Sequence, residues 1–86
     1  MEGFVMLVNS QEKMAAVKTE DGSYSVLKYH QADQIHVGDF LSGDLQNLGF
    51  HFIENHSTGE NLRVCIHHAK GIVAAKTKFL IGMART

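Results

Sequence analysis

The feature that most constrains the fold is a hairpin signal in the first third of the chain. Asp21 and Gly22 stand between two short runs, residues 15–19 and 24–29, which are rich in residues that favour strands. An Asp-Gly pair in this setting is typical of a tight turn between antiparallel strands. The chain contains no proline, so its other turns must also be made by glycine, aspartate and asparagine. The sequence therefore predicts antiparallel β-structure.

Similar short runs recur along the rest of the chain. The further expected strands are residues 3–8, 40–45, 50–54, 62–67 and 72–81, and residues 30–36 are expected to form a loop or one helical turn. Within 62–67 apolar and polar residues alternate, so Leu62, Val64 and Ile66 share one face. For residues 72–81 a helix is the alternative, but Thr77, Phe79 and Ile81 alternate with lysines, which favours a strand.

Evenly spaced short strands in 86 residues predict one domain, residues 1–86. Closing such strands into a barrel removes exposed sheet edges. The predicted fold class is all-β, a small five- to six-stranded OB-like barrel, with an SH3-like barrel as the alternative. A core of this size leaves little room for a deep substrate cavity, so we expect a binding module rather than an enzyme.

Residues 3–30 also contain a spaced set of residues, which are Gly3, Val5, Asn9, Lys13, Asp21, Gly22 and Val26. In this respect the segment resembles the start of cold-shock domains. There a Gly-x-Val-x-x-x-Asn strand leads to a Lys-Gly-Phe-Gly-Phe motif, a turn and a Val-Phe-Val-His-Phe strand. The resemblance implies an OB fold that binds single-stranded nucleic acid. The stacking rings are largely missing, because residues 14–17 read Met-Ala-Ala-Val and Leu27, Tyr29 and His30 occupy the second motif.

Charge is distributed unevenly along the chain. Residues 1–60 hold all nine acidic residues and three lysines, a net charge of −6, whereas residues 61–86 hold five basic residues and no acid, a net charge of +5. The two parts could neutralise each other within one barrel. Alternatively, the basic part forms a strip for an anionic partner such as nucleic acid.

Binding of single strands by small barrels needs stacking rings interleaved with cations on one sheet face. The candidate nucleic-acid contacts are Tyr24, Lys28, Tyr29, Arg63, Lys76 and Lys78. Tyr24 and Lys28 are expected on one face of their strand, with Tyr29 on the other face or at the strand's exit. In the alternative interpretation the tyrosines cap the core and the lysines are simply solvated.

Metal and cofactor binding are not expected, although the chain has six histidines. Cys65 and His67 would share a strand face, but a structural zinc site takes four ligands. Only His51 or His56 could add to that pair. His67 and His68 are adjacent, so on a regular strand they would point to opposite faces.

No catalytic residues are predicted. Asp39 and Asp44, or Cys65 with a histidine, have no spacing that specifies catalysis, and the segment Val37-Gly38-Asp39 is better explained as a turn into a strand. The single cysteine, the lack of a signal-like start and the lack of a membrane-length apolar run predict a cytoplasmic protein without a membrane partner.

The alternative function is a protein–protein interaction or self-association module that uses the same barrel. Its candidate surface is the apolar run Phe79–Met83, which would either cover the barrel's open edge or face a second copy.

Overall fold

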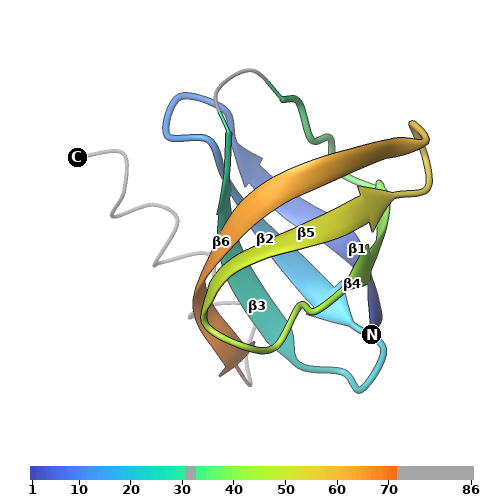
Figure 1. Ribbon diagram of the computed structural model, residues 1–86. Coiled ribbons are helices and arrows are strands. Elements are labelled where there is room, and N and C mark those ends of the chain that lie inside the picture. Colours follow the sequence, from blue (N-terminus) through green and yellow to red (C-terminus); the bar gives the residue numbers. More distant parts are fainter. Residues whose placement is uncertain (31–32, 72–86) are drawn as a thin grey trace.

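A computed structural model describes residues 1–30 and 33–71, with side chains described as far as His68 (Figure 1). The strands are β1 (Glu2–Asn9), β2 (Met14–Thr19), β3 (Tyr24–Tyr29), β4 (Phe40–Gly43), β5 (Gly49–Asn55) and β6 (Glu60–Gly71). The described residues contain no helix.

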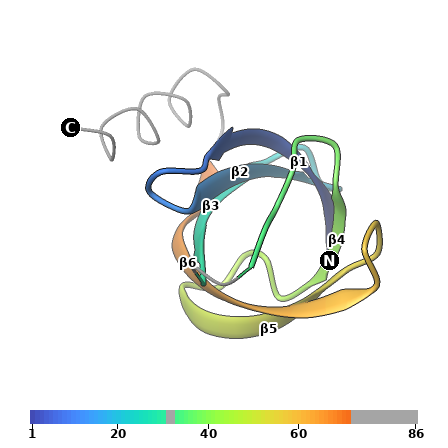
Figure 2. The same ribbon diagram turned by 90° about the horizontal axis from the view of Figure 1, so that it is seen from above.

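The six strands form one closed barrel in the order β1-β2-β3-β6-β5-β4, and every neighbouring pair is antiparallel. Seen from above, the strands surround a central core (Figure 2). Three consecutive strands, β1 to β3, form one meander, and β4 to β6 form a second. The two meanders join through the pairs β1–β4 and β3–β6. Because β4 lies beside β1 rather than beside β3, the connectivity is that of a Greek key.

The all-β barrel predicted from the sequence is confirmed, and six closed strands are consistent with a small OB-like barrel. The predicted strands 3–8, 15–19, 24–29 and 50–54 match β1, β2, β3 and β5 closely, while β4 is shorter than predicted and β6 extends to Gly71. Described residues 30 and 33–36 form no helical turn. The predicted strand 72–81 lies outside the described residues.

Inward-facing residues of all six strands form the core, with buried Val5, Ala15, Val17, Leu27, Tyr29, Leu41, Ile53, Leu62, Val64 and Ile66. Both ends of the barrel are filled by side chains from connections. Residues 33–39 cross one end (Figure 2), where Ile35 is buried in the core. Leu45, which follows β4, is buried at the other end. The core therefore contains no room for a deep internal site.

The strand alternation predicted for 62–67 is confirmed, since Leu62, Val64 and Ile66 are buried and Arg63 and His67 are exposed. The prediction for the following residue is wrong. His68 is exposed like His67, instead of facing the opposite side. The register between β3 and β6 shifts at this point, and an extra residue in a strand leaves two side chains opposite one.

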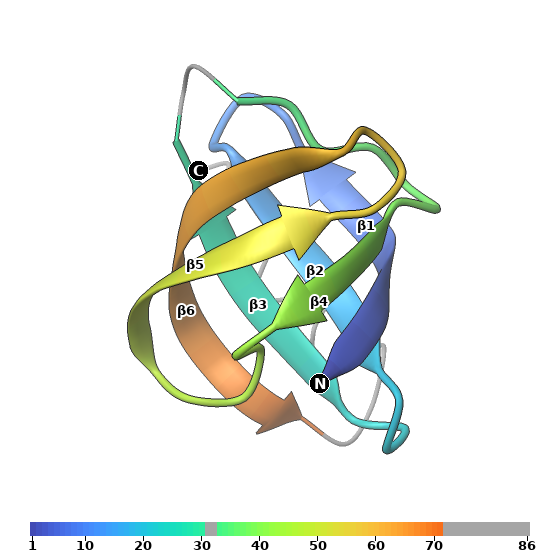
Figure 3. The same cartoon turned by 45° about the vertical axis from the view of Figure 1, so that its right-hand side comes forward.

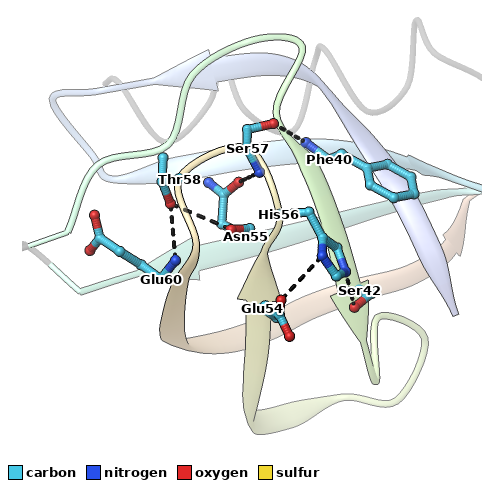
Figure 4. A network of polar contacts seen from close by, with 8 residues as sticks. All are labelled: Phe40, Ser42, Glu54, Asn55, His56, Ser57, Thr58 and Glu60. Carbon is cyan, nitrogen blue, oxygen red and sulfur yellow. Dashed lines mark hydrogen bonds and ion pairs between the residues drawn. The ribbon is translucent and has the colours of Figure 1, made fainter.

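The turn from β5 to β6 is tied to the start of β4 by a polar network (Figure 4). The fully buried Asn55 side chain donates to Asp39 Oδ2 at 2.9 Å and accepts from the Ser57 backbone N–H at 3.0 Å. Ser57 Oγ in turn accepts from the Phe40 N–H at 3.1 Å. A buried amide must be paired in this way to offset its lost hydration. The network therefore fixes the end of β5 against β4.

At the opposite end, Asp21 joins the β2–β3 turn to the β4–β5 connection. Its carboxylate accepts hydrogen bonds from Thr19 Oγ1 at 2.6 Å, Ser23 Oγ at 2.7 Å and Gln46 Nε2 at 2.6 Å. The bonds from Thr19 and Gln46, followed by those from Ser23, hold the pKa of Asp21 well below its ordinary value. The predicted Asp-Gly turn is present, with Gly22 at φ 86°.

Because the folded state lowers the pKa of Asp21, its ionised carboxylate stabilises the fold above the ordinary value of 3.8, and this contribution is lost as the pH falls. Asp21→Asn should therefore lower the free energy of unfolding at about pH 7, and by less at about pH 3. Urea unfolding at both pH values measures the difference. Glu60→Gln, which removes an exposed carboxylate at the start of β6, is the control. A deficit that grows on acidification would contradict this assignment.

Candidate functional site

The outer surface of β3, β6 and β5 combines rings with cations. Its residues are Lys28 on β3, Arg63, Cys65 and His67 on β6, and Phe50 and Phe52 on β5, and we call this surface the Phe50 face. Lys28 pairs with Cys65, which pairs with Phe50, and one step further Arg63 pairs with Phe52. The pairing register therefore places these side chains in two adjacent rows. Figure 3 shows β5 and β6 side by side on this side of the barrel.

Phe50 and Phe52 are the rings of this face. Their exposed fractions are 68% and 77%, because the alternation of β5 turns them outward while Ile53 faces the core. Two residues along a strand separate them by about 7 Å. The Arg63 guanidinium carbon lies 5.1 Å from the centre of the Phe50 ring, a cation–π arrangement. One basic side chain is thus held against an open ring.

A groove of about 600 Å³ adjoins the Phe50 face at the β1–β2 connection. It is lined by Gln11, Glu12, Lys13, Lys28, Tyr29, His30, Phe50, Cys65 and His67. Among the described residues of this lining, Lys13 and Lys28 outnumber the single carboxylate, Glu12, so the groove carries an excess of positive charge. Lys13 Nζ lies 5.9 Å from the centre of the Tyr29 ring, and the Lys13 backbone has a positive φ of 55°. The groove thus extends a cationic surface from Phe50 toward the start of β2.

The nearest acidic side chain of the β4–β5 connection has its own partners. Asn47 Nδ2 donates to both Asp44 oxygens at 2.9 Å, and His51 Nδ1 lies 3.7 Å from Asp44 Oδ2. The hydrogen bond from Asn47 is the main cause of the lowered pKa of Asp44, and the charge of His51 adds to it. Asp44 therefore remains ionised and engaged beside β5.

The structure brings together only some of the residues predicted from the sequence. Lys28 and Arg63 lie on the Phe50 face. Tyr24 is half-buried on the outer side of β3, four residues and about 13 Å along the strand from Lys28. Lys76 and Lys78 lie outside the described residues.

Tyr29 faces inward, as the strand alternation implied, and is only 4% exposed. It belongs to the core and contributes one side of the groove lining. With so little of its ring exposed, it offers no open stacking surface.

Sequence reasoning missed Phe50 and Phe52. A usable signal was present, because Gly49-Phe50-His51-Phe52 has the Gly-Phe-x-Phe spacing of the aromatic cold-shock motif. By chain order, the resemblance places that motif beside Lys13, in the strand of residues 15–19. The rings lie instead on β5.

Other chemistries have less support. No cluster of three or more His, Cys, Asp or Glu side chains suited to a metal ion occurs among the described residues. His56 is engaged by Glu54 at 3.1 Å and by Ser42 at 2.8 Å (Figure 4). Asp39, which is bonded to Asn55, and Asp44 lie at opposite ends of β4, so the two carboxylates are not brought together.

Comparison with known protein families, curated proteins and solved structures finds no match for this chain. In residues 1–30 and 33–71, no helix has the length and apolar character needed to cross a membrane.

Burial raises the pKa of Tyr29 above its ordinary value of 10.0. In a Tyr24→Phe variant Tyr29 is the single remaining tyrosine, so phenolate absorbance reports on it alone. We expect a titration midpoint above 10.0, with circular dichroism confirming that the barrel remains folded. A midpoint at or below 10.0 would show that the ring is exposed to solvent.

Proposed function

We propose that this barrel is a non-enzymatic module that binds single-stranded RNA or DNA, weakly and with low sequence specificity, through the Phe50 face. The observation that carries this proposal is the pair of exposed rings on β5 next to Lys28 and Arg63. Bases stack on the rings, and the cations contact phosphates.

Aromatic rings and cations have separate roles in such binding. Every base has a flat apolar face, so stacking on Phe50 and Phe52 discriminates little between sequences. Phosphate contacts from Lys28, Arg63 and Lys13 also carry no base information. Both kinds of contact therefore favour binding that depends on strand flexibility and salt more than on sequence.

The size of the face limits the affinity. The described part of the face offers two open rings and few cations, and Glu12 lies in the adjoining groove. Lys76 and Lys78 are proposed to extend the cationic surface, as expected from the basic C-terminal part of the chain. The half-buried Tyr24 is proposed as a more distant contact on β3.

Removing the two rings tests the stacking contacts. Phe50→Ala/Phe52→Ala should weaken binding of a labelled short oligonucleotide by about 1–3 kcal/mol for each base that stacks. Fluorescence polarisation at low salt measures the dissociation constant. The matched control is Phe4→Ala/Phe40→Ala, which removes two rings from β1 and β4 and should leave the affinity unchanged. Equal losses in both variants would refute a specific role for the Phe50 face.

Removing the cations tests the phosphate contacts. Lys28→Gln/Arg63→Gln should weaken binding to all sequences and lower the steepness of log K against log salt by about 1.4 for single strands. Lys18→Gln, on the outer face of β2, is the control. Lys76→Glu/Lys78→Glu should likewise weaken binding and flatten the salt dependence. If either double variant leaves the slope unchanged, the two cations changed in that variant do not contact phosphates.

A second candidate function is protein–protein interaction or self-association, favoured by a different surface. Phe4 and Phe40 are 4.8 Å apart between ring centres, and Phe40 lies 5.5 Å from the His56 ring. A hollow of about 400 Å³ beside Phe4 and Phe40 is lined by two carboxylates, Glu2 and Glu20, and by one lysine, Lys18. Carboxylates repel a nucleic-acid backbone, so this surface fits a protein better.

Light scattering across a concentration series separates the two functions. A monomer that responds to the oligonucleotide supports nucleic-acid binding. A dimer that forms with rising concentration and gives no polarisation response supports the second candidate and refutes the first.

A further inference from the structure

The outer side of β2 and β3 carries a small apolar patch. Ala15 and Val17 face the core, so Ala16 between them points outward, and Val26 does so between the buried Ser25 and Leu27. Ala16 and Val26 pair across the two strands. Leu7 and Met14 pack against them, and we call these four residues the outer apolar patch.

The exposure of this patch is unusual for the outer side of the barrel. Ala16 and Val26 are 0% and 1% exposed, although Lys18 and Lys28 on the same faces of the same strands are exposed. Among the described side chains, the partly buried Leu7 and Met14 pack against the pair. Leu7 pairs with Ala16 and His68 pairs with Val26 on the flanking strands, and exposures this low are accounted for by a further cover over these neighbours.

We propose that residues 72–86 of the same chain dock on the outer apolar patch and supply this cover. The described chain ends at Gly71, which pairs with Tyr24. Tyr24 precedes Val26 by two residues on the same outer face, a distance of about 7 Å along β3. The segment therefore begins at the edge of the patch. Even as a helix, with the shortest rise per residue, its fifteen residues would span about 22 Å, enough to cross the patch.

The composition of the segment suits this place. It contains Ile72, Val73, Phe79, Leu80, Ile81 and Met83 and no acidic residue. The patch itself consists of uncharged side chains, so apolar burial is the driving interaction. Covalent attachment at Gly71 gives the segment a high effective concentration at the patch, which favours it over the same segment of a second copy.

Docking has a consequence for charge. The segment carries Lys76 and Lys78, so docking would bring two further lysines to the outer side of the barrel, where β3 also bears Lys28. The docking itself requires no nucleic acid, so it stands or falls independently of the proposed function.

A spin label on the segment tests the docking in the full-length chain. In Cys65→Ser/Ala84→Cys, the new cysteine is the single thiol and carries a nitroxide. Methyl NMR compares signal intensities before and after reduction of the nitroxide. We expect the methyl signals of Leu7, Met14, Ala16 and Val26 to be lost with the nitroxide oxidised and recovered on reduction. The methyl of Thr58, in the β5–β6 turn across the barrel from β2 and β3, serves as the distant reference.

Two acidic variants in the labelled protein provide the matched comparison. Leu80→Asp/Ile81→Asp should restore the patch signals, whereas Thr77→Asp/Thr86→Asp adds the same charge at polar positions and should leave them lost. Unchanged Thr58 and Ile53 signals show that the barrel is folded in both. Patch signals retained in the parent protein would overturn the proposal.

Mixing isotope-labelled chains without nitroxide and spin-labelled chains without isotope detects docking between copies. We expect no loss of patch signals in this mixture. If the patch signals are lost in this mixture as strongly as in a chain that carries both labels, the segment docks on a second copy, and docking within one chain is overturned.

Discussion

The pairing of β1 with β4 is the contact on which the rest of the barrel depends, because it turns a strip of six strands into a closed ring. Gly3 lies in this seam, opposite Leu41 and Thr19 at once. A Cβ at Gly3 would lie 2.7 Å from Val17 Cγ1 and 2.8 Å from the Lys18 carbonyl oxygen, so no larger residue fits without movement. Closure fixes the inward side of every strand and thereby places Phe50 and Phe52 outside.

Much of the fold could be predicted because its signals are local. The Asp21-Gly22 turn and the alternation from Leu62 to Ile66 are each contained in a few neighbouring residues. The site could be predicted only in part, because it depends on pairing between distant segments. That Phe52 lies beside Arg63 follows from the β5–β6 register, and the exposure of His68 follows from a register shift against β3. Tyr29 and Lys28 are neighbours in sequence, and strand alternation separates them into core and surface.

The outer surface of the barrel is divided by charge as well as by strand. Around Phe50 the neighbouring ionisable groups are mainly Lys28, Arg63 and Lys13, whereas the hollow beside Phe4 and Phe40 has Glu2 and Glu20 at its rim. Exposed phenylalanines of the same type therefore sit in opposite electrostatic settings. An anionic polymer and a protein partner would be attracted to different sides of the same small barrel, so the two proposed functions are separable by substitution.

The Greek-key connectivity also determines how the chain reaches this structure. Four of the six strand pairings join consecutive strands, but the two seams join residues far apart, such as Phe4 with Phe40 and Leu27 with Ile66. Each meander can form with little loss of chain entropy, whereas each seam must close a long loop. Once one seam has formed, the second pair of edges is already held nearby, and its additional entropic cost is small. The two meanders therefore join as one cooperative step.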